Sequence, residues 1–254
     1  MSAKTILITG ASSGLGAEMA RQFAAKGYDL ALAARRTERL EELRAEIVAE
    51  HPERRVAHRA LDVTDHEAVF RVFGELRAEL GRLDRVVVNA GLGKGARLGT
   101  GRFDANLETA MTNFVGALAQ TEAAMEIFRD QEAGHLVMVS SFSALRGMPS
   151  SMTTYAATKA GVAHLAEGLR TELHGRPLGR TVKVTVLYPG YIASEMNTQV
   201  EQSTPLMTST EKGVRAMVAA IEKEVDDACV PALPWSALAP VVKHAPLGVV
   251  KRLL

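Results

Sequence analysis

The sequence predicts an α/β protein built on a doubly wound parallel sheet of about seven strands, with helices on both faces. Short apolar runs alternate with amphipathic segments along most of the chain, as in folds where each strand is followed by a helix. Several runs, such as RVVVN at 85–89, are apolar at consecutive positions, which is typical of strands covered on both faces. No linker divides the chain and no repeat is visible, so we expect residues 1–254 to form one domain.

The expected elements follow one another in order. Strands are predicted at residues 4–9, 28–34, 55–61, 84–89, 134–140, 181–188 and 228–231. Helices are predicted at residues 15–26, 37–50, 65–80, 104–129, 153–173 and 210–224. The second helix shows the pattern well, because leucine or isoleucine recurs every three or four residues in TERLEELRAEIVAE and the opposite face is charged.

The composition limits the classes of function. The formal net charge is +1, so we expect no general attraction to nucleic acid. The single cysteine, Cys229, excludes an internal disulfide and a cysteine metal cluster, so we expect no metal and a reducing, cytoplasmic environment. The first apolar run ends at Gly10, too soon for a signal peptide, and no apolar run reaches the roughly 18 residues of a membrane span.

A glycine-rich loop, TGASSGLG at 9–16, joins the first predicted strand to the first helix. Glycine permits positive φ and a close approach to a ligand, and a helix amino terminus attracts phosphate. This position therefore predicts a seat for a dinucleotide pyrophosphate, formed by Gly10, Ser12, Ser13, Gly14, Leu15 and Gly16. The alternative is a structural turn in which Ser12 or Ser13 caps the helix.

Tyr155 and Lys159 stand four apart in a predicted helix, so their side chains lie on one face. A nearby ammonium favours the phenolate and lowers the pKa of a tyrosine from its ordinary value of about 10. A tyrosine tuned in this way exchanges a proton with a carbonyl or alcohol near neutral pH. The pair is therefore predicted to be catalytic, and the alternative is an ordinary surface pair.

The end of the second predicted strand bears on the choice of cofactor. No carboxylate occurs between Leu30 and Thr37 to bind the ribose hydroxyls of NAD, whereas Arg35 and Arg36 follow two alanines. Because guanidinium groups suit a 2′-phosphate, we expect NADP(H) to be favoured over NAD(H). The alternative is that both arginines cap or solvate the next helix.

The loop TGASSGLG resembles the cofactor loop of the short-chain dehydrogenase/reductase family. Further motifs follow in that family's order over roughly residues 4–195, namely Asp62-Val63, Asn89-Ala90-Gly91, Asn113, Ser140-Ser141, Tyr155 with Lys159, and Pro189-Gly190. The resemblance implies a Rossmann-type fold and hydride transfer between a nicotinamide and a carbonyl or alcohol.

The resemblance also implies roles for the catalytic residues. Ser141 is similar to the family's active-site serine, which orients the substrate oxygen, and Asn113 to the asparagine that holds a water near the lysine. Tyr155 lies fourteen residues after Ser141, whereas thirteen is usual, so Ser140 and Ser143 stay open as alternatives.

The remaining cofactor contacts come from the same resemblance. Asp62 and Val63 are expected at the adenine, and Asn89, Ala90 and Gly91 beneath the adenosine. Tyr155 and Lys159 complete the set, together with Pro189, Gly190, Ile192 and Ser194 around the nicotinamide, where Ser194 replaces the usual threonine.

The carboxy-terminal part carries fewer signals. Residues 195–215 are expected to form a substrate-covering loop region, lined by Met196, Leu206 and Met207. Residues 231–254 are a proline-broken, apolar and basic tail. We expect it to pack on the domain or on a second subunit, and the alternative is contact with a membrane surface, which would make the protein peripheral to the membrane. The resemblance suggests a homodimer or homotetramer built from 104–129 and 153–173.

Together these observations predict an NADP-dependent oxidoreductase that interconverts a ketone and a secondary alcohol, in the reductive direction, on an apolar or acyl-chain substrate. Two alternatives are an NAD-linked secondary alcohol dehydrogenase and a cofactor-sensing binding protein without turnover. The presence of both Tyr155 and Lys159 argues against the second alternative.

Overall fold

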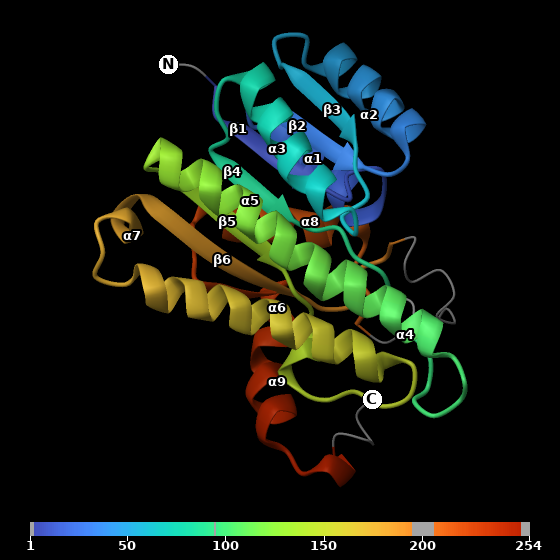
Figure 1. Ribbon diagram of the computed structural model, residues 1–254. Coiled ribbons are helices and arrows are strands. Elements are labelled where there is room, and N and C mark those ends of the chain that lie inside the picture. Colours follow the sequence, from blue (N-terminus) through green and yellow to red (C-terminus); the bar gives the residue numbers. More distant parts are fainter. Residues whose placement is uncertain (1–2, 94, 195–205, 250–254) are drawn as a thin grey trace.

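The computed structural model describes residues 3–93, 95–194 and 206–249, and within them the strands form one parallel sheet in the order β3-β2-β1-β4-β5-β6-β7. The strands are β1 (Thr5–Thr9), β2 (Asp29–Ala34), β3 (Val56–Ala60), β4 (Arg85–Val88), β5 (Gly134–Val139), β6 (Val182–Pro189) and β7 (Asp227–Val230). The predicted seven-stranded parallel sheet is confirmed (Figure 1).

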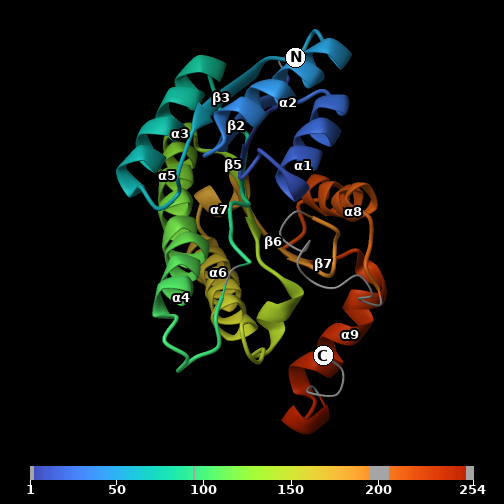
Figure 2. The ribbon, with the colours of Figure 1, turned by 90° about the vertical axis from the view of Figure 1, so that its right-hand side faces the viewer.

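Helices cover both faces of this sheet (Figures 1 and 2). They are α1 (Gly14–Ala25), α2 (Thr37–Glu50), α3 (His66–Leu80), α4 (Phe103–Ala110), α5 (Gly116–Gln131), α6 (Met152–Leu173), α7 (Leu178–Thr181), α8 (Thr210–Glu222) and α9 (Ala232–His244). Two shorter helical segments are η1 (Met111–Val115), a π-helical turn, and η2 (Phe142–Leu145), a 3₁₀ turn. Local signals set their bounds: the Asp65 side chain accepts a hydrogen bond from Ala68 N–H at the start of α3, and Gly81, at φ +87°, follows its end.

Two apolar cores lie on the two faces of the sheet. In β1, Ile6 and Ile8 face the core formed with α1, α2 and α8, whereas Leu7 faces the core formed with α3, α5 and α6. Successive strand residues point to opposite faces, so a strand with both faces covered needs apolar residues at every position. This burial explains the consecutive apolar runs of the sequence.

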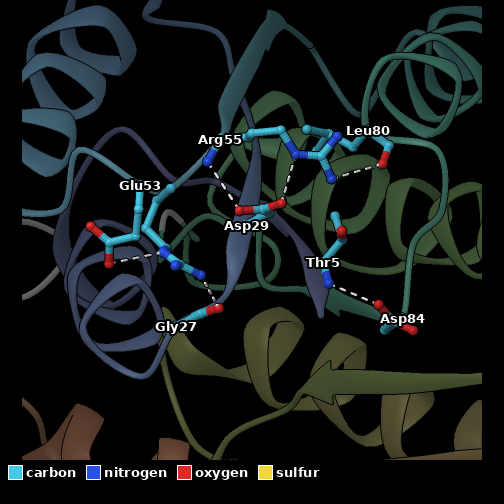
Figure 3. Close-up of polar contacts among 8 residues, drawn as sticks. Thr5, Gly27, Asp29, Glu53, Arg55, Leu80 and Asp84 are labelled. Carbon is cyan, nitrogen blue, oxygen red and sulfur yellow. Dashed lines mark hydrogen bonds and ion pairs between the residues drawn. The ribbon is translucent and has the colours of Figure 1, made fainter. Parts of the chain in front are cut away.

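Polar contacts tie together the amino-terminal ends of the first strands (Figure 3). The backbone N–H of Thr5 donates to Asp84 Oδ2 at 2.8 Å. Asp29 accepts from the Arg55 N–H at 3.0 Å and from Arg55 Nε at 2.7 Å, while Arg55 Nη2 donates to Leu80 O at 3.1 Å. Ligands bind to open α/β sheets at the carboxyl ends of the strands. These polar contacts lie at the opposite edge of the sheet, away from that binding edge.

The structure differs from the predicted elements in several places. The helix expected at 104–129 is interrupted by the π-helical turn η1, which carries Asn113. The tail expected to be broken by prolines contains α9, which lies beyond β7 at the end of the sheet (Figure 2). Of the expected covering loop at 195–215, residues 195–205 lie outside the described part of the chain, and the residues from Thr210 onward belong to α8.

Candidate active site

The glycine loop has the shape of a phosphate cradle. Gly10 and Gly14 have φ of +64° and +53°, which side-chain-bearing residues rarely adopt. A Cβ on Gly10 would lie 2.9 Å from Ala90 Cα, and one on Gly16 would lie 2.4 Å from Gly10 O. Thr9 supports the loop, because its Oγ1 accepts from the N–H groups of Asn89 and Ala90, both at 3.1 Å. The loop therefore leaves its backbone open at the amino terminus of α1, where an anion is favoured.

The serines of this loop are held by an arginine. Ser13 occupies the N-cap position of α1, but its side chain makes no capping hydrogen bond. Instead, Arg36 Nη2 donates to Ser13 Oγ at 2.6 Å, and Arg36 Nε donates to Ser12 Oγ at 3.3 Å. The guanidinium group of Arg36 thus lies directly on the cradle, where it suits a phosphate.

Hydrogen bonds fix the orientation of the Asp62 carboxylate, which lies near Arg35. Its Oδ1 accepts from the Thr64 N–H at 3.0 Å and from the Thr64 hydroxyl at 2.8 Å. Burial alone would raise the pKa of Asp62, but these hydrogen bonds and the charge of Arg35 hold that pKa below its ordinary value. The carboxylate is therefore ionised and fixed in direction.

One cavity of about 780 Å³ brings most of the predicted site residues together. Those that line it are Gly10, Ser12, Ser13, Gly14, Leu15, Arg35, Arg36, Asp62, Val63, Asn89, Ala90, Gly91, Ser141, Tyr155, Lys159, Pro189, Gly190, Ile192 and Ser194. Gly16 and Asn113 do not line it and lie just behind Gly10 and Gly91. The glycine loop, Tyr155 and Lys159 therefore open into the same space.

Lys159 is 5% exposed, and its Nζ donates to Val139 O at 2.8 Å. Burial lowers the pKa of Lys159 to about 8. Its Nζ lies 6.0 Å from the centre of the Tyr155 ring. Burial raises the pKa of Tyr155, and the hydrogen bond with Ser141 opposes that rise. The pKa of Tyr155 is thus raised above its ordinary value, and the expectation that Lys159 favours the phenolate stays a prediction.

The three neighbouring serines have distinct surroundings. The Ser140 hydroxyl donates to the Lys159 carbonyl at 2.8 Å, so it is bound to the backbone of α6. Ser141 Oγ accepts from the Ser143 N–H at 3.2 Å and from the Ser143 hydroxyl at 2.9 Å. A hydroxyl that accepts two hydrogen bonds keeps its own proton to donate, and Ser141 lies within hydrogen-bonding reach of Tyr155.

Asn113 is 1% exposed and is held by the loop after β4. Its Oδ1 accepts from the Leu92 N–H at 2.7 Å, and its Nδ2 donates to Leu92 O at 2.8 Å. A Cβ on Gly91 would lie 3.2 Å from Asn113 Oδ1 and 3.4 Å from Lys159 Nζ. Gly91 therefore lets the asparagine and the lysine approach the same stretch of backbone. π-helical turns such as η1 are frequent at functional sites.

Comparison with known proteins identifies the family. The family model described as short chain dehydrogenase matches residues 4–205. The chain belongs to this family. An uncharacterized oxidoreductase of Mycobacterium tuberculosis is 55% identical over 233 residues, which are 92% of this chain and 90% of that protein. The structure of an alcohol dehydrogenase from Thermococcus sibiricus, complexed with 5-hydroxy-NADP, is 26% identical with a TM-score of 0.79 and covers 91% of this chain and 97% of its own.

A third comparison shows the shared fold. A short-chain dehydrogenase/reductase from Burkholderia phymatum, solved in complex with NAD, has a TM-score of 0.81 at 22% identity and covers 95% of this chain and 92% of its own. The protein is thus a short-chain dehydrogenase/reductase, an NAD(P)-dependent oxidoreductase acting on CH–OH and C=O groups. Among the described helices, none has the length and apolar character needed to cross a bilayer.

Apart from Leu206, the apolar residues that line the rest of this short-chain dehydrogenase/reductase cavity were not predicted. That part is lined by Phe142, Met148, Pro149, Met152, Tyr191, Leu206, Trp235, Leu238 and Val242. Of the three residues expected to line a covering loop, Leu206 lines the cavity, Met207 does not, and Met196 lies outside the described residues. The spacing of Trp235, Leu238 and Val242 at i, i+3 and i+7 is a helical signal that could have revealed the wall formed by α9.

Proposed function

We propose that the protein is an NADP-dependent reductase that converts an apolar ketone to a secondary alcohol. The observation that carries this proposal is the joining, in one cavity, of a glycine cradle flanked by two arginines with a half-buried tyrosine, a half-buried serine and a buried lysine. The apolar far end of the cavity supports an apolar substrate.

Two arginines beside the glycine cradle support a dinucleotide that carries an extra phosphate. The cradle at Gly10 and Gly14 would hold the pyrophosphate, and Arg35 and Arg36 would bind the 2′-phosphate. Bound NADPH supplies a hydride for the carbonyl carbon. Lys159 and Pro189 would hold the nicotinamide end, on the family pattern.

Ser141 and Tyr155 would act on the carbonyl oxygen of the substrate. Ser141 would donate a hydrogen bond to the carbonyl oxygen and so stabilise the charge that develops there. Tyr155 would give its proton to the same oxygen, which becomes the alcohol. Its raised pKa keeps Tyr155 protonated at neutral pH, and a protonated acid suits the reductive direction.

Lys159 would stabilise the phenolate that remains. A pKa of about 8 leaves Lys159 mostly charged at pH 7. Its ammonium favours the ionised tyrosine at the end of the reaction. Asn113, which lies next to this lysine behind Gly91, would support return of the proton from solvent.

The test is a titration with NADPH and NADH followed by fluorescence. Arg35→Ala and Arg36→Ala should each weaken NADPH binding by about 10- to 100-fold, since each removes a charge-assisted hydrogen bond, and should leave NADH binding nearly unchanged. Arg71→Ala, an exposed arginine of α3, is the matched control. Tighter binding of NADH by the wild-type protein would contradict the NADP preference and favour the NAD-linked oxidation.

We also propose a homodimer built on α4 and α5, in a family whose members are commonly oligomeric. An exposed apolar stripe runs along these helices at Phe103, Leu107, Phe114 and Leu118. Light scattering after size exclusion should give twice the 27.2 kDa chain mass, and Leu107→Glu with Leu118→Glu should reduce it to one chain. A monomeric wild-type protein would exclude this interface.

The outer face of α9 favours contact with an anionic membrane surface. Leu233 and Val241 are 77% and 46% exposed, and Leu247, which follows α9, is 71% exposed. The sequence after Asp227 contains no acidic residue. Co-flotation with vesicles of anionic phospholipid should be lost in the pair Leu233→Glu and Val241→Glu, which leaves the inner face intact. Absence of co-flotation by the wild-type protein would remove this idea.

A further inference from the structure

Trp235 is enclosed by aromatic rings at the far end of the cavity. Its ring centre lies 4.7 Å from that of Phe142 and 5.4 Å from that of Tyr191, and the residue is 4% exposed. Such tilted and edge-on contacts stabilise an aromatic cluster. The indole therefore has a defined position, set by η2 on one side and by the turn after β6 on the other.

Gly190 provides the surface on which the indole rests. A Cβ on Gly190 would lie 2.0 Å from Trp235 Cε2 and 2.2 Å from its Nε1, so any side chain there would displace the ring. The Gly190 N–H donates to Val230 O at 3.0 Å, which joins the turn after β6 to the end of β7. Because β7 leads directly into α9, this hydrogen bond also fixes the start of the helix that carries Trp235.

The inner face of α9 forms a wall of the cavity that contains Tyr155 and Ser141. Trp235, Leu238 and Val242 all line this cavity. Trp235 and Val242 also form a small core with Phe142 that is separate from the two cores of the sheet. The wall is therefore packed from behind and does not depend on the substrate for its shape.

Among the described residues, the charged ones that line the cavity are few and belong to elements other than α9. They are Arg35, Arg36, Asp62 and Lys159, which lie at the cofactor cradle and the catalytic pair. The end near Trp235 offers hydrocarbon and aromatic surface without a charged side chain to pair with an anion. An ionised group placed there would lose its hydration without compensation.

We infer that Trp235 is the specificity-determining residue of this site, and that it selects neutral ketones whose hydrocarbon chain or ring lies against the indole. Keto acids with a carboxylate at the far end of the same chain are excluded. The inference rests on the proposed ketone reduction, and it adds which part of the chain recognises the substrate.

The direct test uses two matched probes, 2-decanone and 9-oxodecanoate, which differ by a terminal carboxylate. Trp235 is the only tryptophan of the chain, so tryptophan emission reports this subsite alone. With NADP⁺ bound, which has no hydride to give to a ketone, 2-decanone should change the emission, and 9-oxodecanoate should need at least about tenfold higher concentration. Equal responses to both probes, or no response to 2-decanone, would overturn the inference.

Turnover by variants provides the second readout. Trp235→Ala should lower kcat/KM for 2-decanone by about tenfold or more and change that for butanone by less than about threefold, with Trp235→Phe in between. Leu233→Ala, on the outer face of α9, is the matched control and should change neither. An equal loss for both ketones, with NADPH binding retained, would make Trp235 a merely structural residue.

The emission measurement separates this inference from the proposed function. It needs only wild-type protein and no chemistry, so it stands even if Trp235→Ala does not fold. If 2-decanone changes the emission but is not reduced, the subsite is upheld and the proposed reaction fails. If ketones are reduced but the emission does not respond, the reaction is upheld and the subsite fails.

Discussion

His135 makes the stability of the protein depend on pH in a way that the structure allows us to calculate. This histidine of β5 is 3% exposed, and its Nε2 lies 2.9 Å from Thr185 Oγ1. Thr185 gives its only hydroxyl proton to Val225 O, so it must accept from Nε2–H, which leaves Nδ1 as the nitrogen to be protonated. Nδ1 is buried without a hydrogen-bond partner among the described residues, and the Arg85 charge is close.

Burial, with the Arg85 charge, lowers the pKa of His135 to about 3, although Glu222 opposes this. The unfolded chain takes up the proton first, near pH 6.5, so the contribution to stability is complete above that pH and is lost as the pH falls toward 3. The loss between pH 7 and pH 5 amounts to about 2 kcal/mol of unfolding free energy. A shift of this size corresponds to roughly 4–8 °C in Tm for a domain of this length.

The assay is urea unfolding followed by circular dichroism at pH 7, 6 and 5, for the wild-type protein and His135→Gln. Glutamine keeps a donor for Thr185 but does not titrate. The carboxylates of both proteins titrate alike, so the difference between the two curves isolates His135. The wild-type protein should lose about 2 kcal/mol more than the variant between pH 7 and pH 5. A difference that stays constant over this range would refute a buried neutral histidine.

Three further predictions concern the site itself. Tyr155→Phe should reduce kcat by about 10²- to 10⁴-fold through loss of the proton donor; a variant that keeps its turnover would remove Tyr155 from the chemistry. Gly16→Ala should weaken NADPH binding at least about tenfold, because the added Cβ would lie 2.4 Å from Gly10 O. Gly74→Ala is the control: a Cβ there would have no atom within 4 Å, so this variant should bind NADPH normally. Ser143→Ala should lower kcat about 5- to 10-fold at unchanged KM, since Ser141 loses one hydrogen bond, and Ser143→Thr should restore it; a change in KM alone would contradict this role.

The sequence predicted the sheet well because its strands are covered on both faces. A run such as 86–88 can be apolar at consecutive positions only if both of its faces are buried. The alternation of such runs with amphipathic helices then leaves few possible arrangements of the chain. The bounds agree to within a few residues for every predicted strand. Burial of apolar side chains contributes most to the stability of such a fold, and the spacing of those side chains along the chain reveals it directly.

Helix α9 escaped prediction because its prolines outweighed its apolar spacing. Leu233 has non-helical angles, so the regular helix begins at Pro234, where a missing N–H costs nothing. Pro240 removes one internal hydrogen bond, a cost of about 3 kcal/mol, which packing of Trp235 and Val242 offsets. Helix propensity depends on residues that are close in the sequence, whereas Phe142, which packs against Trp235 of α9, lies far from this helix in the sequence.

The catalytic pair shows a second limit of the sequence. The spacing of Tyr155 and Lys159 correctly put both residues on α6 beside one cavity. It could not give the sign of the pKa change in Tyr155, because that sign depends on how deeply the cleft buries the hydroxyl. A one-residue insertion between Ser141 and Tyr155 likewise gave no hint that Ser143 would hydrogen-bond to Ser141.

Because α9 follows the last strand, substitutions on this helix differ in their effect from substitutions in the sheet or in the glycine cradle. The inner face of α9 lines the cavity, yet the helix lies outside the sheet and contributes no residue to the glycine cradle. Substitutions at positions such as Leu238 can therefore alter which molecules are accepted while leaving cofactor binding and the sheet intact. New substrate preferences can arise here one side chain at a time, on a scaffold that does not have to be rebuilt.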